Sequence, residues 1–115
     1  MKYLCLIYNE ERRVETMPQD ELDAVMRDCE PFVETLRAKG KLIAADRLQP
    51  IGMATTIRIG NGGKVSITDG PFAETKEQLG GYYLIDARDL DEAISIASRI
   101  PPARFGCVEV RPIRA

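Results

Sequence analysis

The segment DGPFAETKEQLGG, residues 69–81, decides how this chain is organised because it separates two strand patterns. An apolar alternating pattern ends at Asp69, a turn follows at Gly70-Pro71, charged positions come next, and Gly80-Gly81 restarts a strand. Connections in small domains usually have about 4–6 residues, so a longer one of unusual composition is typical of a functional or architectural segment. We therefore expect such a role here.

Hydrophobic periodicity on both sides of this segment predicts the other elements. The expected strands cover residues 2–8, 41–48, 54–59, 64–68, 81–87 and 106–113. A first helix is expected to begin at Thr16, with Gln19 completing a capping box, and to end at Gly40. Residues 9–15 are polar and predict an exposed loop.

A second helix and a hairpin complete the expected order. Asp89 and Glu92 form a capping-box pattern that opens this helix, and Pro101 ends it. Residues 60–63, Gly-Asn-Gly-Gly, predict a β-hairpin with a type I′ turn. Without the hairpin the order is βαββαβ, which is the ferredoxin-like α+β arrangement, with two helices on one face of an antiparallel sheet. Residues 1–115 are expected to form a single domain.

Composition excludes several functional classes. The formal net charge of -2 and the lack of a clustered basic face exclude a nucleic-acid-binding surface. No apolar run approaches the ~20 residues of a membrane span, and the first residues lack a signal-peptide pattern, so we expect a cytoplasmic protein. The chain has no histidine, which removes Ser-His-Asp and Cys-His catalysis and imidazole metal ligands. Its cysteines are widely spaced and form no CxxC pair, so no zinc site is expected.

Strand alternation indicates that one sheet face stays open after the helices are placed. In the last strand, Val108 and Val110 fit the helix-covered face, which puts Glu109 and Arg111 on the opposite face. The first strand has no polar face at all, so the open face is too apolar to remain in water. A second subunit that lays its own sheet against this face would cover it, so we expect a homodimer that encloses a ligand site.

Five side chains are the candidate site residues. Asp69 has either a turn-stabilising role or a role in proton transfer beside a cleft. Phe72 either covers that cleft or packs in the core. Arg58, Glu109 and Arg111 form either a structural ion-pair network or, through the two arginines, a binding site for a carboxylate or phosphate. Gly80-Gly81 precedes a strand and lacks a following Lys-Ser/Thr, so it is not a phosphate loop and more simply provides a bend or a close backbone approach.

The motif Asp69-Gly-Pro-Phe-Ala-Glu-Thr-Lys-Glu77, followed by Gly80-Gly81-Tyr82-Tyr83, resembles the signature of the DGPF group of YCII-related proteins. The closing strand, residues 108–113, and the opening residues 1–8 resemble that group too. The resemblance implies a ferredoxin-like fold that forms a dimeric α+β barrel, with a His–Asp pair in the dimer cleft. Asp69 matches the acidic member of this pair, whereas the histidine has no counterpart in this chain. The resemblance implies no cofactor, and it implies a link to alternative sigma factors.

These observations lead to one main hypothesis and two alternatives. The main hypothesis is a homodimer that binds a small polar or anionic molecule in a cleft near Asp69, with Arg58 and Arg111 orienting the ligand. One alternative is a non-catalytic regulatory module that acts through a protein partner such as a sigma factor. The other is a small enzyme that uses Asp69 as a general base.

Overall fold

The computed structural model describes residues 1–115. The strands are β1 (Lys2–Asn9), β2 (Leu42–Arg47), β3 (Thr55–Ile59), β4 (Val65–Asp69), β5 (Gln78–Asp86) and β6 (Gly106–Pro112). The helices are α1 (Glu11–Glu15), α2 (Gln19–Ala38) and α3 (Leu90–Ala97), with short 3-10 turns η1 (Ile51–Met53), η2 (Asn61–Gly63) and η3 (Pro101–Phe105). None of the helices combines the length and the apolar character that a membrane span requires.

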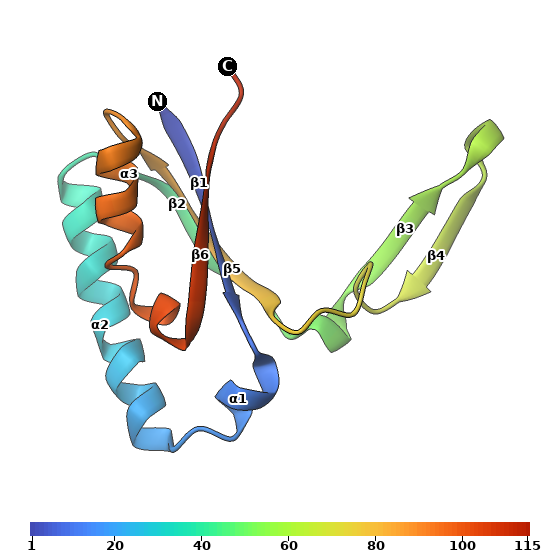
Figure 1. The fold of residues 1–115 in the computed structure, drawn as a ribbon, viewed down its shortest axis with the longest axis horizontal. Coiled ribbons are helices and arrows are strands. Elements are labelled where there is room, and N and C mark those ends of the chain that lie inside the picture. Colours follow the sequence, from blue (N-terminus) through green and yellow to red (C-terminus); the bar gives the residue numbers. More distant parts are fainter.

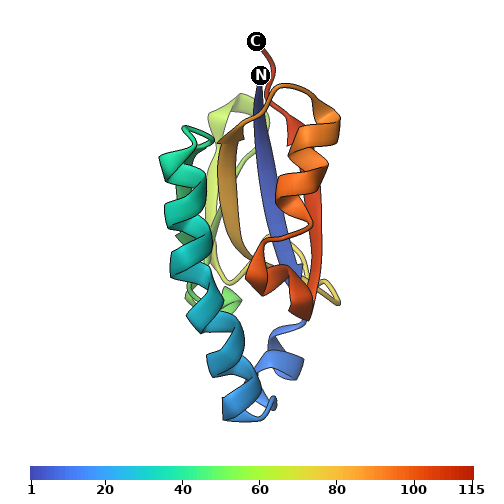
Figure 2. The same cartoon turned by 90° about the vertical axis from the view of Figure 1, so that its left-hand side faces the viewer.

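A four-stranded sheet in the order β2-β5-β1-β6 forms the main body. Each neighbouring pair in this sheet is antiparallel. The helices α2 and α3 lie side by side on one face, and the opposite face has no helix on it (Figures 1 and 2). This strand order and this layering confirm the predicted ferredoxin-like α+β fold.

The core lies between the sheet and the two helices. Tyr3, Cys5 and Ile7 of β1 alternate toward the helices and are at most 4% exposed. Ile85 of the neighbouring strand β5 is fully buried beside them. Burial raises the pKa of the Cys5 thiol to about 11, so this cysteine stays protonated and packs as a small apolar side chain.

The hairpin β3–β4 projects from the body as a separate two-stranded sheet, and we call residues 55–69 the arm (Figure 1). Because of the arm the chain extends 47 × 41 × 19 Å, and its radius of gyration is 16.2 Å. A compact chain of this length has a radius of gyration of about 13 Å. The hairpin itself was predicted and is confirmed, whereas its isolation from the main sheet was not predicted.

The turn of the arm differs from the predicted type I′ turn. Residues 60–64 form the loop, in which the Gly60 backbone N–H donates to the Lys64 carbonyl at 2.7 Å. The positive φ angles fall on Gly62 and Gly63, and Asn61 has none. The predicted turn put the left-handed residues one position too early. A second glycine after Asn-Gly allows Gly62 and Gly63 to adopt the left-handed conformation in place of Asn61 and Gly62.

The start of the first long helix also differs from the prediction. Residues 11–15 form the short helix α1 in place of a loop, and α2 begins at Gln19 after Pro18. Thr16 caps neither helix start, because its hydroxyl donates back to the Arg12 carbonyl at 3.0 Å. The cap predicted at Asp89 is confirmed, because Asp89 accepts from the Glu92 N–H at 2.9 Å. Glu92 reaches back to the Arg88 N–H at 2.9 Å, one residue before the N–H that a standard capping box uses.

Gly80-Gly81 provides the close backbone approach that its sequence predicted. A Cβ atom on Gly81 would lie 2.9 Å from the Asp46 carbonyl oxygen of β2, and one on Gly80 would lie 2.9 Å from the Asn9 side chain. The register between β1 and β5 shifts at this point, with Ile7 opposite Gly81 and Tyr8 opposite Leu79. The bulge re-aims the chain where β5 leaves the motif and enters the sheet.

Candidate functional site

Three of the predicted site residues lie on the arm or at its base. Asp69 is the last residue of β4 and pairs with Thr55. Arg58 of β3 donates from Nη2 to the Phe72 carbonyl oxygen at 3.0 Å, and the Phe72 side chain is 73% exposed. The register pairs Arg58 with Ser66, so Arg58 and Asp69 project from opposite faces of the arm.

The other two predicted residues lie on the open face of the main sheet. Glu109 and Arg111 of β6 form an ion pair, with Arg111 Nε donating to Glu109 at 3.1 Å. This interaction raises the pKa of Arg111. Tyr8 of β1 also donates to Glu109, at 3.4 Å. Val108 and Val110 pack against the core from the other side, as their alternation predicted.

The two groups do not meet within one chain. Every hydrogen bond and ion pair made by Arg58 stays at the base of the arm, and every one made by Glu109 and Arg111 stays at the β1–β6 edge. Asp69 has no side-chain hydrogen bond or ion pair within the chain. A single chain therefore presents two half-sites.

The open sheet face has an apolar centre and a polar rim. Leu4 and Leu6 of β1 pair across the sheet with Leu84 and Tyr82 of β5, and all four are partly exposed. At one edge, Tyr82 donates its hydroxyl proton to Asp46 at 2.8 Å, and this bond raises the tyrosine pKa. An apolar floor with a few polar groups at its edge is the usual composition of a small-molecule site.

A cavity of about 770 Å³ between α1, α2 and the far end of the sheet was not predicted from the sequence. Its apolar wall includes Leu22, Met26 and Val33 of α2 together with Tyr83 and Phe105. The sequence placed the α2 side chains on the apolar stripe of the helix and Tyr83 in a strand, which predicts packing. Nothing in the pattern indicates that these side chains leave a hollow between them, so the sequence carried no signal for the cavity.

Tyr83 is a nearly buried polar group on the wall of this cavity, whose lining also includes charged side chains such as Glu11, Glu30 and Arg47. Its side chain is almost buried, its hydroxyl makes no hydrogen bond within the chain, and burial raises its pKa to about 12. Cys29 lies on the same wall, and burial raises the pKa of its thiol, while the charge of Arg47 acts in the opposite direction. Tyr83 is therefore protonated at neutral pH and can donate a hydrogen bond to a molecule in the cavity, whereas the Cys29 thiol already donates to the Val25 carbonyl at 3.5 Å.

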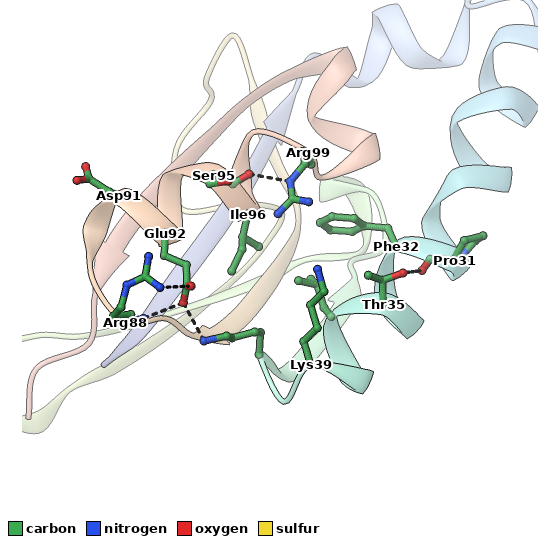
Figure 3. Close-up of a pocket in the computed structure, with 12 residues that line it drawn as sticks. Pro31, Phe32, Thr35, Lys39, Arg88, Asp91, Glu92, Ser95, Ile96 and Arg99 are labelled. Carbon is green, nitrogen blue, oxygen red and sulfur yellow. Dashed lines mark hydrogen bonds and ion pairs between the residues drawn. The ribbon is translucent and has the colours of Figure 1, made fainter.

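A second hollow, of about 550 Å³, runs between α2 and α3 on the outer surface (Figure 3). Two of its cationic side chains are engaged around Glu92, which accepts from Lys41 at 2.9 Å and lies 3.3 Å from an Arg88 nitrogen. The Arg88 N–H and Lys41 together hold the pKa of Glu92 below its usual value. This cluster fixes the start of α3 to the segment before β2, and we assign it a structural role.

Replacement of Glu92 by glutamine is expected to lower the free energy of unfolding, because Lys41 and Arg88 then lose their counter-charge. The pKa of Glu92 is lowered on folding, so its contribution is complete above the unfolded pKa near 4.5 and disappears as the pH falls through the folded value. The difference between wild type and Glu92→Gln should therefore be constant from pH 6 to pH 8 and shrink below about pH 4.5. Urea unfolding at several pH values measures this, and a difference that stays constant down to pH 3 would contradict the assignment.

No group of three or more Cys, Asp or Glu side chains is arranged to hold a metal ion.

A comparison with protein families identifies the family of this chain: the family model of the YCII-related domain matches residues 1–115. The chain belongs to the YCII-related family. A relative from Rhizobium meliloti (strain 1021), the uncharacterised protein R00369, is 42% identical over 115 residues, which is 98% of this chain and 92% of that protein.

A solved structure shares the fold of this YCII-related chain. It is 5-chloro-2-hydroxyhydroquinone dehydrochlorinase (TftG) from Burkholderia phenoliruptrix AC1100, in complex with 2,5-dihydroxybenzoquinone. The TM-score is 0.56 at 17% sequence identity, with 99% of this chain and 94% of that chain covered. At this identity the comparison shows a common fold and no common residue roles.

Proposed function

We propose that this YCII-related protein is a homodimer that binds a small polar or anionic molecule in the cleft between its subunits. The observation that supports this proposal most directly is the open face of the main sheet. This face has an apolar centre, and Tyr8, Glu109 and Arg111 lie at its edge. A partner subunit laid over this face encloses a space with an apolar wall and charged edges. In this assignment Asp69 accepts a proton or hydrogen bond from the ligand, Arg111 orients it, and Phe72 lines the cleft. Arg58, which was also predicted to orient the ligand, projects from the opposite face of the arm and holds the Phe72 carbonyl, so it does not face the ligand.

The common fold with the dehydrochlorinase supports a small-molecule role. That structure holds 2,5-dihydroxybenzoquinone, a small ring compound with polar oxygens. A compound of this class would match an apolar floor with hydrogen-bonding groups at its edge. Because this chain has no histidine, a His–Asp pair cannot form, and any proton transfer in the cleft would rest on Asp69.

The cavity below α2 is the second place where such a molecule fits. Its volume of about 770 Å³ lies in the range of roughly 300–1,000 Å³ that is usual for ligand pockets. The unpartnered hydroxyl of Tyr83 would gain a hydrogen bond from a ligand that carries an acceptor. The cleft and the cavity make different predictions for two variants.

A thermal-shift screen against small carboxylates, phosphates, phenols and quinones tests the function and locates the site. A bound compound at a hundred times its dissociation constant is expected to stabilise the wild type by about 2.7 kcal/mol, or roughly 10 °C. Loss of the shift in Asp69→Asn places the ligand in the cleft, and loss in Tyr83→Phe places it in the cavity. Both variants preserve side-chain shape, so each serves as the control for the other.

The outcome against the proposal is equally specific. If none of the compounds stabilises the wild type, the small-molecule function is wrong and the regulatory alternative gains support. That alternative predicts a protein captured from a cell extract whose binding is weakened by exchange of the exposed Glu74 or Lys76 and unaffected by Asp69→Asn. Consumption of a bound compound by wild type, and its persistence with Asp69→Asn, would instead support the enzyme alternative.

A further inference from the structure

We infer that the arm, residues 55–69, docks by its apolar face on a second copy of this chain and carries Asp69 into the partner's half of the site. The inference rests on the proposed homodimer and states which surface of one subunit completes the site of the other. The site would be incomplete in a single chain, because Asp69 lies on the arm whereas Glu109 and Arg111 lie on the main sheet.

The arm has two faces of opposite character. Ile57 pairs with Ile67, and Ile59 pairs with Val65, so four branched aliphatic side chains share one face. They are between 54% and 73% exposed, although residues of this type are normally buried. The other face carries Thr56, Arg58, Ser66 and Thr68. An amphipathic hairpin with its whole apolar face in water indicates a missing partner.

Within the chain, the arm is held only by the backbone hydrogen bonds between β3 and β4 and by a few bonds at its base. Every hydrogen bond of residues 55–69 stays within residues 54–72, including the bonds from Gly70 to Ala54 and from Thr56 to Gly70 at the base. An isolated two-stranded hairpin is at best marginally stable in water. The arm also lacks the proline that protects many exposed strand edges, and the one charge on its apolar face, Asp69, lies at its base. A docked partner supplies both the stability and the protection.

A second copy of the chain is the occupant that satisfies both unpartnered surfaces at once. The main sheet presents its own apolar centre, with Leu4, Leu6, Tyr82 and Leu84, on the face that no helix covers. Figure 1 shows the arm leaning away from this face of its own chain. In a twofold dimer, each arm and each sheet face occurs twice in symmetric positions, so one arrangement buries all four surfaces. A standard interface buries roughly 1,600 Å² in total, and burial of both surfaces on both copies contributes more area toward it than burial of either surface alone.

Docking by the apolar face fixes which site residue changes subunit. Asp69 pairs with Thr55, and alternation places both on the face that carries Ile57 and Ile67. The Asp69 carboxylate, which has no partner in its own chain, would therefore enter the interface. Arg58 projects from the opposite face and stays with Phe72 of its own chain. The composite site then combines Asp69 of one copy with Glu109 and Arg111 of the other.

Sedimentation equilibrium of full-length variants tests this inference. Ile57→Asn combined with Ile67→Asn is expected to raise the dimer dissociation constant about 100-fold, because the pair lies at the centre of the apolar face. Ser66→Asn, next to Ile67 on the opposite face, is the matched control and should leave the constant within about threefold. Far-UV circular dichroism reports whether the main body of each variant remains folded.

Photo-crosslinking reports where the arm lies. A benzophenone amino acid at position 67 is expected to give a cross-linked dimer, with the attachment in residues 4–6 or 82–84 of the partner. A wild-type dimer whose constant is unchanged in the double variant would overturn the arm inference and leave the proposed dimer cleft intact. A wild type that stays monomeric at 100 µM would overturn both. Cross-links confined to one chain would also overturn the arm inference.

Discussion

Replacement of Gly106 by alanine is expected to lower the free energy of unfolding by about 3 kcal/mol or more, although it adds only one methyl group. Gly106 is the first residue of β6 and pairs with Asn9 of β1. A Cβ atom there would lie 1.9 Å from the Tyr8 carbonyl oxygen and 2.9 Å from the Asn9 Cα atom. Both atoms belong to the backbone of a central strand, so no flexible side chain can move aside, and the β1–β6 pairing must shift instead.

Urea unfolding at a fixed protein concentration measures this effect, since the stability of a dimer depends on concentration. Gly52→Ala is the matched control, because a Cβ atom on Gly52 would have no heavy atom within 4 Å and the φ of this residue is not positive. Equal stabilities of Gly106→Ala and Gly52→Ala would show that β6 does not approach β1 as closely as this. Because β6 also carries Glu109 and Arg111, a displaced strand should weaken ligand binding in the cleft as well.

The fold was predictable because its signals are local. The apolar run of β1, the alternation in β6, the helical stripe of α2 and the Asp89–Glu92 cap pattern each report on a few neighbouring residues. Together they give the element order. Helix α1 escaped prediction because residues 11–15 have no apolar stripe to mark a helical face. The helix start predicted at Thr16 was wrong because a threonine hydroxyl can donate to a carbonyl of the preceding helical turn, here that of Arg12, as readily as it can cap the next helix.

The candidate site was less predictable because it depends on register and on distance between elements. Whether Arg58 and Asp69 share a face follows from the pairing of Thr55 with Asp69, and this pairing depends on a loop over residues 60–64 whose geometry the sequence misplaced by one residue. The isolation of the arm reflects contacts that a single chain lacks, and sequence periodicity does not register missing contacts. The cavity beside Tyr83 depends on how α1, α2 and the end of the sheet lie relative to one another, which is a tertiary property.

Replacement of Ile85 by alanine is expected to cost about 3–4 kcal/mol, because it removes three buried carbons from the best-packed part of the core. Ile85 is fully buried in β5, where it lies opposite Tyr3 of β1 and Leu42 of β2. The lost stability combines the transfer free energy of the deleted atoms with the cavity that they leave. Ile85→Val, which removes one carbon, is expected to cost about 1 kcal/mol.

Ile94→Ala is the control with the same chemistry, since Ile94 lies in α3 and is 50% exposed. Its cost should stay near or below about 1 kcal/mol, because little burial is lost and alanine has the higher helix propensity. Ile85 faces the helices and Leu84 faces the open side of the sheet, so the two neighbours separate stability from association. Ile85→Ala should lower the urea midpoint and leave the dimer constant of the folded protein unchanged, whereas Leu84→Asn should raise that constant with a smaller loss of stability. A dimer constant that responds equally to both substitutions would mean that the open face of the sheet is not the surface on which the subunits meet.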